Sequence, residues 1–352
     1  MSNKRRLPFP PSKDQRIQTK SVLDKMEDGR EFESILKYQV VDFDLVGEIR
    51  KSLDEIKAVR NRPAICYLSN FVNQNIKTSI SIDYTDDLPF SEMISSIEGT
   101  VEEIDIITAT PGGSAEQVAK FVDKLRPRFN NVAFIIPSKA MSAGTIFALS
   151  GDDIIMDSRA YIGPIDPQVP NKDGYYVPAQ AILALVEDIR KRGEDLLAKG
   201  QKPPWTDFQI LRQLDGKEIG NALNASKYSI ELAEKYLYNY KFKTWDKHDS
   251  DGRKVEDIEK QKRATEIAEK LCSNEQWKTH SRGITREAAW SECQIKITHP
   301  ENQEGLSRAI RRFWALIYWI FETTSIVKIF VSENYCILRT DPSLKKLEVN
   351  RG

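Results

Sequence analysis

Apolar positions change their spacing along the chain, and each change marks an expected element. Between residues 42 and 60 they recur every three to four positions, which predicts an amphipathic helix. The residues on its apolar face are Leu45, Ile49, Leu53 and Ile56. From residue 63 onward the apolar runs become short and rich in β-branched residues. We therefore expect strands over residues 63–70 and 78–85, and a helix over residues 89–97.

Residues 101–157 alternate between two patterns. Apolar runs predict strands over residues 101–110, 131–137 and 152–157, and helices are expected in the two gaps between them. The first helix opens on a capping box of Ser114 and Gln117, and the second covers residues 142–149. The apolar stripe of the first consists of Val118, Phe121, Val122 and Leu125. This alternation is typical of a parallel sheet with crossover helices, so residues 63–165 are expected to form an α/β core.

The pattern beyond this core is mainly helical. Helices are expected over residues 179–197, 219–241, 255–271 and 305–324. Residues 277–298 have a mixed hydrophobic pattern, and residues 326–339 are expected to form a short hairpin.

The charge balance narrows the classes of partner. The chain of 352 residues has 52 Lys and Arg against 52 Asp and Glu, so its formal net charge is zero. A chain without excess positive charge has no bulk attraction to nucleic acid or to an anionic membrane. The longest apolar run, residues 313–321, is about half as long as a membrane span, and the basic N-terminus has no apolar core. We therefore expect a cytoplasmic protein with neither a nucleic-acid nor a membrane partner.

Cysteine and glycine spacing argue against cofactors. The four cysteines lie in or next to apolar segments without C-x-x-C spacing, as buried free thiols do in a reducing cytosol. They are Cys66, Cys272, Cys293 and Cys336. The spacing offers no zinc site, and no phosphate-binding glycine motif is present. The sequence predicts neither a metal nor an organic cofactor.

Two glycine-bearing turns, each after a predicted strand, carry the candidate chemistry. T-P-G-G-S covers residues 110–114, and A-M-S-A-G-T covers residues 140–145. Backbone amides at such turns are unpaired, so those of Gly113 and Ala143 could share an oxyanion beside the Ser142 hydroxyl if the turns lie together. Two simpler interpretations stay open. In one, Gly112 and Gly113 serve only to form a tight turn; in the other, Ser142 only caps a helix.

The order and spacing of these turns over residues 63–170 resemble the Clp protease and crotonase superfamily. Where Clp-type proteases carry a histidine, this chain has G-P-I-D-P-Q (163–168) with Asp166. That motif and W-x-x-H-x-R-x-I-x-x-E-A, which starts at Trp277, resemble the serine dehydrogenase proteinase family over residues 60–300. The resemblance implies an α/β fold with a Clp/crotonase-like ββα spiral core and a mainly helical C-terminal half.

The resemblance also implies a role for each matching residue. Ser142 would be the nucleophile, His280 the general base and Asp166 the residue that orients His280, while Gly113 and Ala143, with Gly112 in the same turn, would form the oxyanion hole. A serine hydroxyl needs such a base, and the imidazole needs an acceptor on its other nitrogen. His280 as a structural or surface residue and Asp166 as a turn initiator before a proline remain the alternatives.

A different base is also considered. Signal peptide peptidase A, another Clp relative, uses a Ser–Lys dyad, and Lys191 falls in the corresponding window, with Lys199 just past it. A lysine acts as a base at neutral pH only when it is desolvated. Because Lys191 is surrounded by charged residues, a solvated helix face is the favoured interpretation.

Together these features predict a serine hydrolase, most simply a peptidase that cleaves peptides or unfolded chains and forms a homo-oligomer. The alternatives are a catalytically silent peptide-binding scaffold and a crotonase-like acyl-thioester enzyme. We expect a mobile basic tail over residues 1–20, an N-terminal helical segment over 21–60 and the catalytic core over 61–175. Residues 176–352 are expected to complete the fold and to supply a lid and the oligomer interface.

Overall fold

The computed structural model describes residues 21–37, 43–171, 174–248 and 251–344. The predicted basic tail over residues 1–20 lies outside the described residues. A six-stranded sheet with the order β11-β10-β1-β2-β3-β5 forms the centre of the fold. Its four parallel strands are β1 (Ala64–Ser69), β2 (Glu103–Ala109), β3 (Asn131–Ile136) and β5 (Asp153–Met156). The α/β class predicted from the sequence is confirmed.

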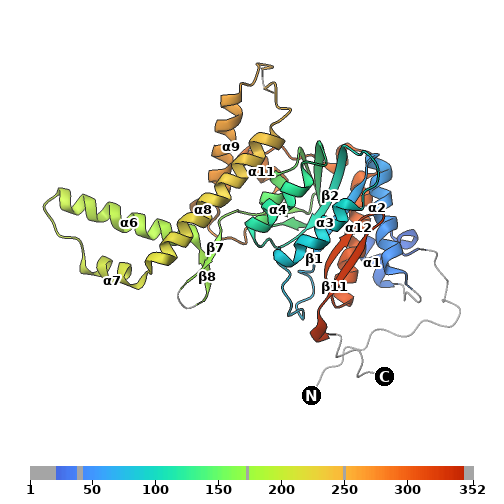
Figure 1. Cartoon of the computed structure of the whole chain (residues 1–352), viewed down its shortest axis with the longest axis horizontal. Coiled ribbons are helices and arrows are strands. Elements are labelled where there is room, and N and C mark those ends of the chain that lie inside the picture. The colour runs from blue at the N-terminus through green and yellow to red at the C-terminus, as the bar shows by residue number, and fades with distance from the viewer. Residues whose placement is uncertain (1–20, 38–42, 172–173, 249–250, 345–352) are drawn as a thin grey trace.

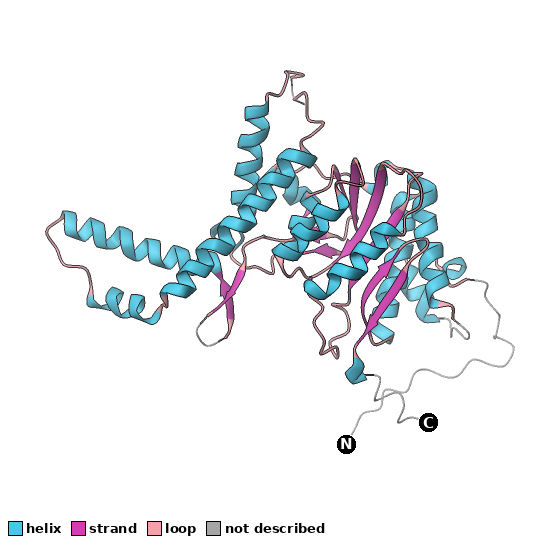
Figure 2. Ribbon diagram, in the orientation of Figure 1, coloured by secondary structure: helices cyan, strands magenta, loops and turns pink. Residues whose placement is uncertain are grey.

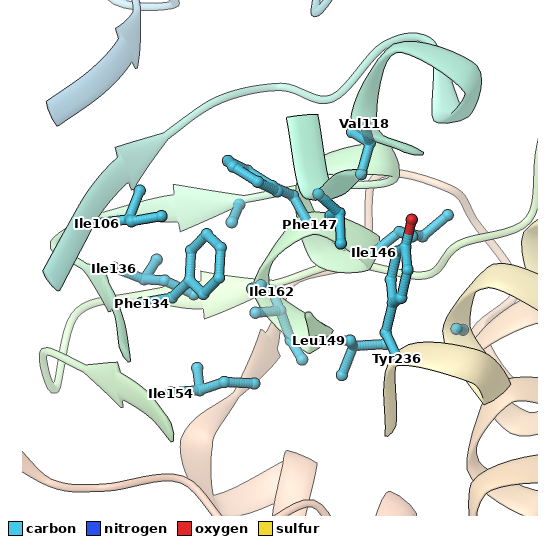
Figure 3. Packing of buried hydrophobic residues seen from close by; sticks show 14 of the residues in the cluster. Ile106, Val118, Phe134, Ile136, Ile146, Phe147, Leu149, Ile154, Ile162 and Tyr236 are labelled. Carbon is cyan, nitrogen blue, oxygen red and sulfur yellow. The ribbon is translucent and has the colours of Figure 1, made fainter. Parts of the chain in front are cut away.

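Helices cover both faces of this sheet (Figures 1 and 2). One face packs against α3 (Asp87–Ser95), α4 (Ala115–Leu125) and α5 (Ala143–Leu149). The other packs against α1 (Glu31–Lys37), α2 (Leu45–Arg60) and α12 (Leu306–Thr323). The strands are buried on both faces, as parallel strands between helix layers must be, so alternate residues of β1 belong to different cores. Figure 3 shows Phe134 and Ile136 of β3 in the core that contains Phe147 of α5.

Helix α4 carries the apolar stripe that the sequence predicts, because Val118, Phe121, Val122 and Leu125 are all buried. Its predicted capping box is only half formed. Ser114 Oγ accepts a hydrogen bond from Gln117 N at 3.0 Å. The Gln117 side chain instead donates to Asp87 Oδ1 at 2.8 Å, while the backbone N–H of Ser114 donates to the carbonyl of Ile82.

The predicted strand over residues 78–85 is wrong. Only Ile82 forms a β-bridge, to Gly113, and a 3₁₀ turn over Tyr84–Asp86 follows directly. The alternating apolar pattern is overridden because Asp83 caps that turn by accepting the Thr85 N–H at 2.8 Å. The next helix, α3, accordingly begins at Asp87 and not at Pro89.

A second, three-stranded sheet lies beside the first and was not expected. It has the order β4-β6-β9 and consists of the two-residue strands β4 (Lys139–Ala140), β6 (Tyr161–Ile162) and β9 (Ile284–Thr285). Strands β4 and β6 are parallel, and β9 is antiparallel to β6. Runs of two residues have no periodicity, so no sequence pattern marks them.

The C-terminal half is mainly helical. It contains α6 (Ala179–Ala198), α7 (Trp205–Gln213), α8 (Gly216–Tyr236) with a π turn over Leu237–Lys241, and α9 (Asp257–Cys272). Shorter elements are β7 (Gln168–Pro170), β8 (Tyr176–Pro178), α10 (Asn274–Trp277) and α11 (Arg286–Cys293). Helices α6, α7 and the start of α8 project from the core as an arm (Figure 1), whereas the end of α8 enters the core through Tyr236, as Figure 3 shows.

The predicted C-terminal hairpin consists of β10 (Ile326–Val331) and β11 (Cys336–Thr340). Strand β10 also pairs with β1 in antiparallel register, so the C-terminal region contributes two strands to the main sheet. In the described residues, no helix combines the length and the apolar character needed to cross a membrane.

Candidate active site

Ser142 lies in the turn between β4 and α5, in a backbone conformation that non-glycine residues rarely adopt. Its φ is 53° and its ψ is −120°. It occupies the N-cap position of α5, but its hydroxyl makes no capping hydrogen bond. Such a conformation costs about 1–3 kcal/mol and persists only where the surroundings enforce it. The hydroxyl is therefore presented by a strained strand-to-helix turn and is not used as a cap.

The two glycine turns lie side by side. The backbone N–H of Met141 donates to the carbonyl of Thr110 at 3.1 Å. Gly112 has a φ of +99°, and a Cβ atom built on it would lie 2.5 Å from the Met141 carbonyl oxygen and 2.8 Å from Ser142 Cβ. No side chain fits in that space, so glycine at position 112 allows the two turns to touch.

Gly113 is held from its other side by Ile82. The Ile82 N–H donates to the carbonyl of Gly112 at 2.8 Å, and the Ser114 N–H donates to the carbonyl of Ile82 at 2.9 Å. In this parallel bridge the Gly113 amide points away from Ile82. Within the described residues the amides of Gly113 and Ala143 donate to no acceptor. Two unpaired donors thus lie in the two touching turns, one of them on the residue directly after Ser142.

The small sheet brings the remaining candidates to the same edge. Strands β4 and β6 run in parallel, so Ser142, two residues beyond β4, and Asp166, four residues beyond β6, follow strand ends at one edge. Strand β9 runs the other way, so His280, four residues before it, lies at that edge too. The Thr145 hydroxyl joins two of these segments, because Oγ1 lies 2.8 Å from the Ala140 carbonyl oxygen and 2.9 Å from that of Gly163.

Asp166 and His280 are in direct contact. His280 Nδ1 lies 2.8 Å from Asp166 Oδ1, the carboxylate is 1% exposed and the imidazole 24%. Buried Trp277 and Ile284 anchor the chain on either side of His280. A proton on Nδ1 directed at the carboxylate leaves Nε2 free to accept a proton from a nucleophile. Asp166 Oδ2 is buried and has no hydrogen-bond partner among the described residues.

The structure does not bring every candidate into contact. Among the described residues, neither the Ser142 hydroxyl nor Nε2 of His280 makes a hydrogen bond. Catalytic hydrogen bonds of this kind commonly form only once substrate is bound. Lys191 lies on the projecting arm, where its side chain is 65% exposed and faces Glu187 at 3.6 Å. Its environment is the solvated helix face that the sequence favours.

The cysteines are not candidates for nucleophilic chemistry. Cys66, Cys272 and Cys293 are buried free thiols, and Cys336 is partly exposed. Burial raises the pKa of the Cys272 thiol, and the nearby charge of Asp166 raises it further. Burial likewise raises the pKa of Cys293 to about 12. These thiols are protonated at neutral pH and are poor nucleophiles. Within the described part of the chain, no group of three or more His, Cys, Asp and Glu side chains is placed to hold a metal ion.

Sequence reasoning missed the residues that support the glycine turn from behind. Ile82 bridges Gly113, and Lys328 of β10 donates to the carbonyl of Ser81 next to it. A sequence pattern carries no signal for either contact, because both join segments far apart in the chain. A surface hollow lined by Arg50, Lys57 and Pro63 lies at the amino end of β1, away from the candidate site.

Residues 79–199 match the model of a family described as ClpP-like SDH-type serine proteinase. This segment of the chain is therefore similar to that serine proteinase family. The resemblance drawn from the glycine turn, the M-S-A-G serine and G-P-I-D-P-Q is confirmed for this stretch. The SDH-type segment contains Gly112, Gly113, Ser142 and Asp166, and His280 lies beyond it.

Two uncharacterized proteins of Methanocaldococcus jannaschii are similar to parts of the chain. Uncharacterized protein MJ1495 is 33% identical over 156 residues, which are 44% of this chain and 50% of the relative. Uncharacterized protein MJ0137 is 47% identical over 87 residues, 24% of this chain and 28% of the relative. The chain thus spans about half the length of one of these relatives and less of the other.

Two solved structures are distantly similar. A mutant of the 1510-N membrane-bound stomatin-specific protease has a TM-score of 0.36 and 17% identity, with 62% of this chain and 74% of that chain covered. A monofunctional enoyl CoA isomerase from M. smegmatis has a TM-score of 0.24 and 14% identity, with 61% and 92% covered. Neither similarity is close enough to bear on the activity of this chain.

Proposed function

We propose that this protein is a serine peptidase that cleaves peptides or unfolded chains with Ser142 as its nucleophile. The observation that carries the proposal is the strained turn of Ser142, which carries the unpaired amide of Ala143 and touches the glycine turn that carries the unpaired amide of Gly113. A nucleophile beside two preorganised N–H donors is what acyl transfer requires. The match of residues 79–199 to a model of a ClpP-like serine proteinase family supports the same reaction class.

In the proposed mechanism, the Ser142 oxygen attacks a peptide carbonyl while His280 Nε2 takes the hydroxyl proton. The tetrahedral oxyanion accepts hydrogen bonds from the amides of Gly113 and Ala143. His280 then gives its proton to the departing amine, and an ester to Ser142 remains. A water molecule attacks this ester and gives its proton to His280, which returns it to the Ser142 oxygen as the acid leaves. Asp166 stabilises the imidazolium and fixes its orientation.

Hydrolysis of a fluorescently labelled unfolded protein such as casein tests the proposal. Ser142→Ala should lower turnover at least about 10³-fold, because loss of a triad nucleophile removes the covalent route. Ser138→Ala is the matched control, since Ser138 lies four residues earlier in the segment leading into the same turn. It should retain wild-type turnover. Equal activity of wild type and Ser142→Ala would contradict the peptidase proposal.

The same variants separate the alternatives. A crotonase-like acyl-thioester enzyme uses the oxyanion hole without a serine nucleophile, so it would turn over a thioester equally well with Ser142→Ala. A silent scaffold would bind unfolded chains and cleave none. Loss of activity in Lys191→Ala but not in His280→Ala would replace the proposed triad with a Ser–Lys dyad.

A further inference from the structure

The segment that supports the glycine turn has little regular structure of its own. Residues 76–82 contribute a single β-bridge, between Ile82 and Gly113. Side chains from β10 and from the residue after β11 bind its backbone at both ends. Asp341 accepts the N–H groups of Lys77 at 2.7 Å and Thr78 at 3.2 Å, and Lys328 Nζ donates to the carbonyl of Ser81 at 2.6 Å. The place of Ile82 therefore depends on side chains that come from far along the chain.

Lys328 is a buried charge with an unusually complete set of partners. Its side chain is 2% exposed and projects from β10. Besides the Ser81 carbonyl, the ammonium lies 2.7 Å and 2.9 Å from the two carboxylate oxygens of Asp86 and 3.3 Å from Asp83. Asp86 is fully buried and also accepts from Tyr67 Oη at 2.9 Å and from Arg339 Nη1 at 2.9 Å.

A buried ion pair is weak evidence for stability, because its desolvation cost can exceed its Coulombic gain. An alternative role for such a pair is to select one local conformation over others. Here the geometry in question is that of Ser81 and Ile82, which an apolar side chain at position 328 could not hold. Ile82 is 1% exposed and bonds to both neighbours of Gly113, so a shift of Ile82 moves the Gly113 amide.

We propose that Lys328, together with Asp86, is a positioning residue for the oxyanion hole. Its ammonium fixes the Ser81 carbonyl, Ser81 places Ile82, and the backbone of Ile82 sets the direction of the Gly113 N–H toward the carbonyl that Ser142 attacks. Lys328 touches no reacting atom. The inference rests on the proposed function for its effect on turnover, but its first steps concern backbone geometry alone.

The experiment compares Lys328→Met with Lys241→Met. Lys241 is also a buried lysine, with a side chain 7% exposed that faces Asp153 at 3.6 Å, but it lies at the amino end of β5. Both variants lose a buried ammonium, and only one of them loses the contact to Ser81. Lys328→Met should lower kcat on a peptide substrate about 10- to 100-fold with KM within about twofold of wild type, because the lost interaction acts in the transition state. Lys241→Met should leave both constants near wild type.

A second readout needs no activity. Amide hydrogen exchange at Ser114, whose N–H donates to the Ile82 carbonyl, should be at least about tenfold faster in Lys328→Met and unchanged in Lys241→Met. Lys328→Arg keeps the charge, so it should recover part of the kcat and part of the Ser114 exchange protection that Lys328→Met loses. If Lys328→Met does not fold, Asp86→Asn is measured in the same way and should show the same changes.

The outcomes separate the two ideas. Unchanged Ser114 exchange, or unchanged kcat in a folded Lys328→Met protein, would overturn the positioning role. Equal losses in the two lysine variants would do the same, since the effect would then be general destabilisation. A different outcome would refute the proposed function alone: Ser114 exchange is faster in Lys328→Met as expected, but the wild-type protein hydrolyses no peptide. Lys328 would then be a purely structural support of the turn.

Discussion

Ser142 is the residue at which three local features coincide. Its backbone is strained, its hydroxyl makes no cap, and unpaired amides lie in its own turn and in the glycine turn that touches it. The sequence shows that the neighbours Ala143 and Gly144 are small. Small neighbours leave room for a substrate carbonyl to reach the Ser142 hydroxyl. The strain and the contact with Gly112 are not visible, because they depend on how two separate turns pack.

Gly113→Ala tests the oxyanion hole at the residue scale. Gly113 has a φ of +148°, and an added Cβ would lie 2.3 Å from the Ile82 carbonyl oxygen. The turn must shift to make room, so kcat should fall about 10²- to 10³-fold, as for the loss of one oxyanion donor. The measurement is steady-state peptide hydrolysis.

Gly99→Ala is the control for backbone strain alone. Gly99 also has a positive φ, +75°, but an added Cβ meets no atom within 4 Å. It should cost stability without lowering kcat. If the two variants have equal kcat, the Gly113 amide does not contribute to the reaction.

At the scale of elements, two-residue strands decide where the site forms. Strands β4, β6 and β9 bring three distant segments to one edge of the small sheet. Each of these strands has only two residues and so shows no hydrophobic periodicity in the sequence. The longer elements of the core were predictable because its strands are short, continuous apolar runs rich in β-branched residues and its helices carry a period-3.6 pattern. The error over residues 78–85 has a different origin, since local side-chain hydrogen bonds of Asp83 to Thr85 outweigh an alternating pattern that is present.

Asp157 connects the end of strand β5 to helix α12. It follows β5 and accepts hydrogen bonds from the Arg159 N–H and side chain and from Arg311 of α12. Burial alone would raise the pKa of this carboxyl, but the Arg159 and Arg311 contacts outweigh burial and hold its pKa below the ordinary value of 3.8. A depressed pKa stabilises the fold above the ordinary value, and this contribution is lost as the pH falls through the folded-state pKa.

Asp157→Asn should therefore lower the free energy of unfolding by about 1–3 kcal/mol at pH 7. Thermal unfolding of both proteins from pH 7 down to pH 3 measures the difference. The gap should be constant at neutral pH and should shrink below about pH 4. A gap that stays constant to pH 3 would mean that the ionised carboxylate is not the stabilising group.

At the scale of the whole molecule, the arm of α6, α7 and the start of α8 leaves large apolar side chains in contact with solvent. The most exposed of them are Trp205 at 73%, Leu197 at 63% and Phe208 at 56%. Contiguous exposed apolar surface is typical of protein interfaces. The homo-oligomer expected from the sequence stays a proposal, in which this arm would pack against a second copy of the chain. The cytoplasmic location expected from the sequence stays a prediction.

Light scattering coupled to size-exclusion chromatography tests that arrangement. The wild type should elute with the mass of an oligomer, and the double variant Trp205→Ser, Phe208→Ser should elute with a smaller mass. Gln201→Ser, a polar change on the same arm, should keep the wild-type mass. A monomeric wild type would rule out this role for the arm.

Reaction with a fluorophosphonate, followed by mass spectrometry to locate the adduct, tests whether Ser142 is the nucleophile. We expect one adduct per chain, carried by Ser142, absent in Ser142→Ala and formed at least about 10²-fold more slowly in His280→Ala. Lys191→Ala should react at the wild-type rate. A folded wild-type protein that forms no adduct, or an adduct that persists in Ser142→Ala, would contradict the account.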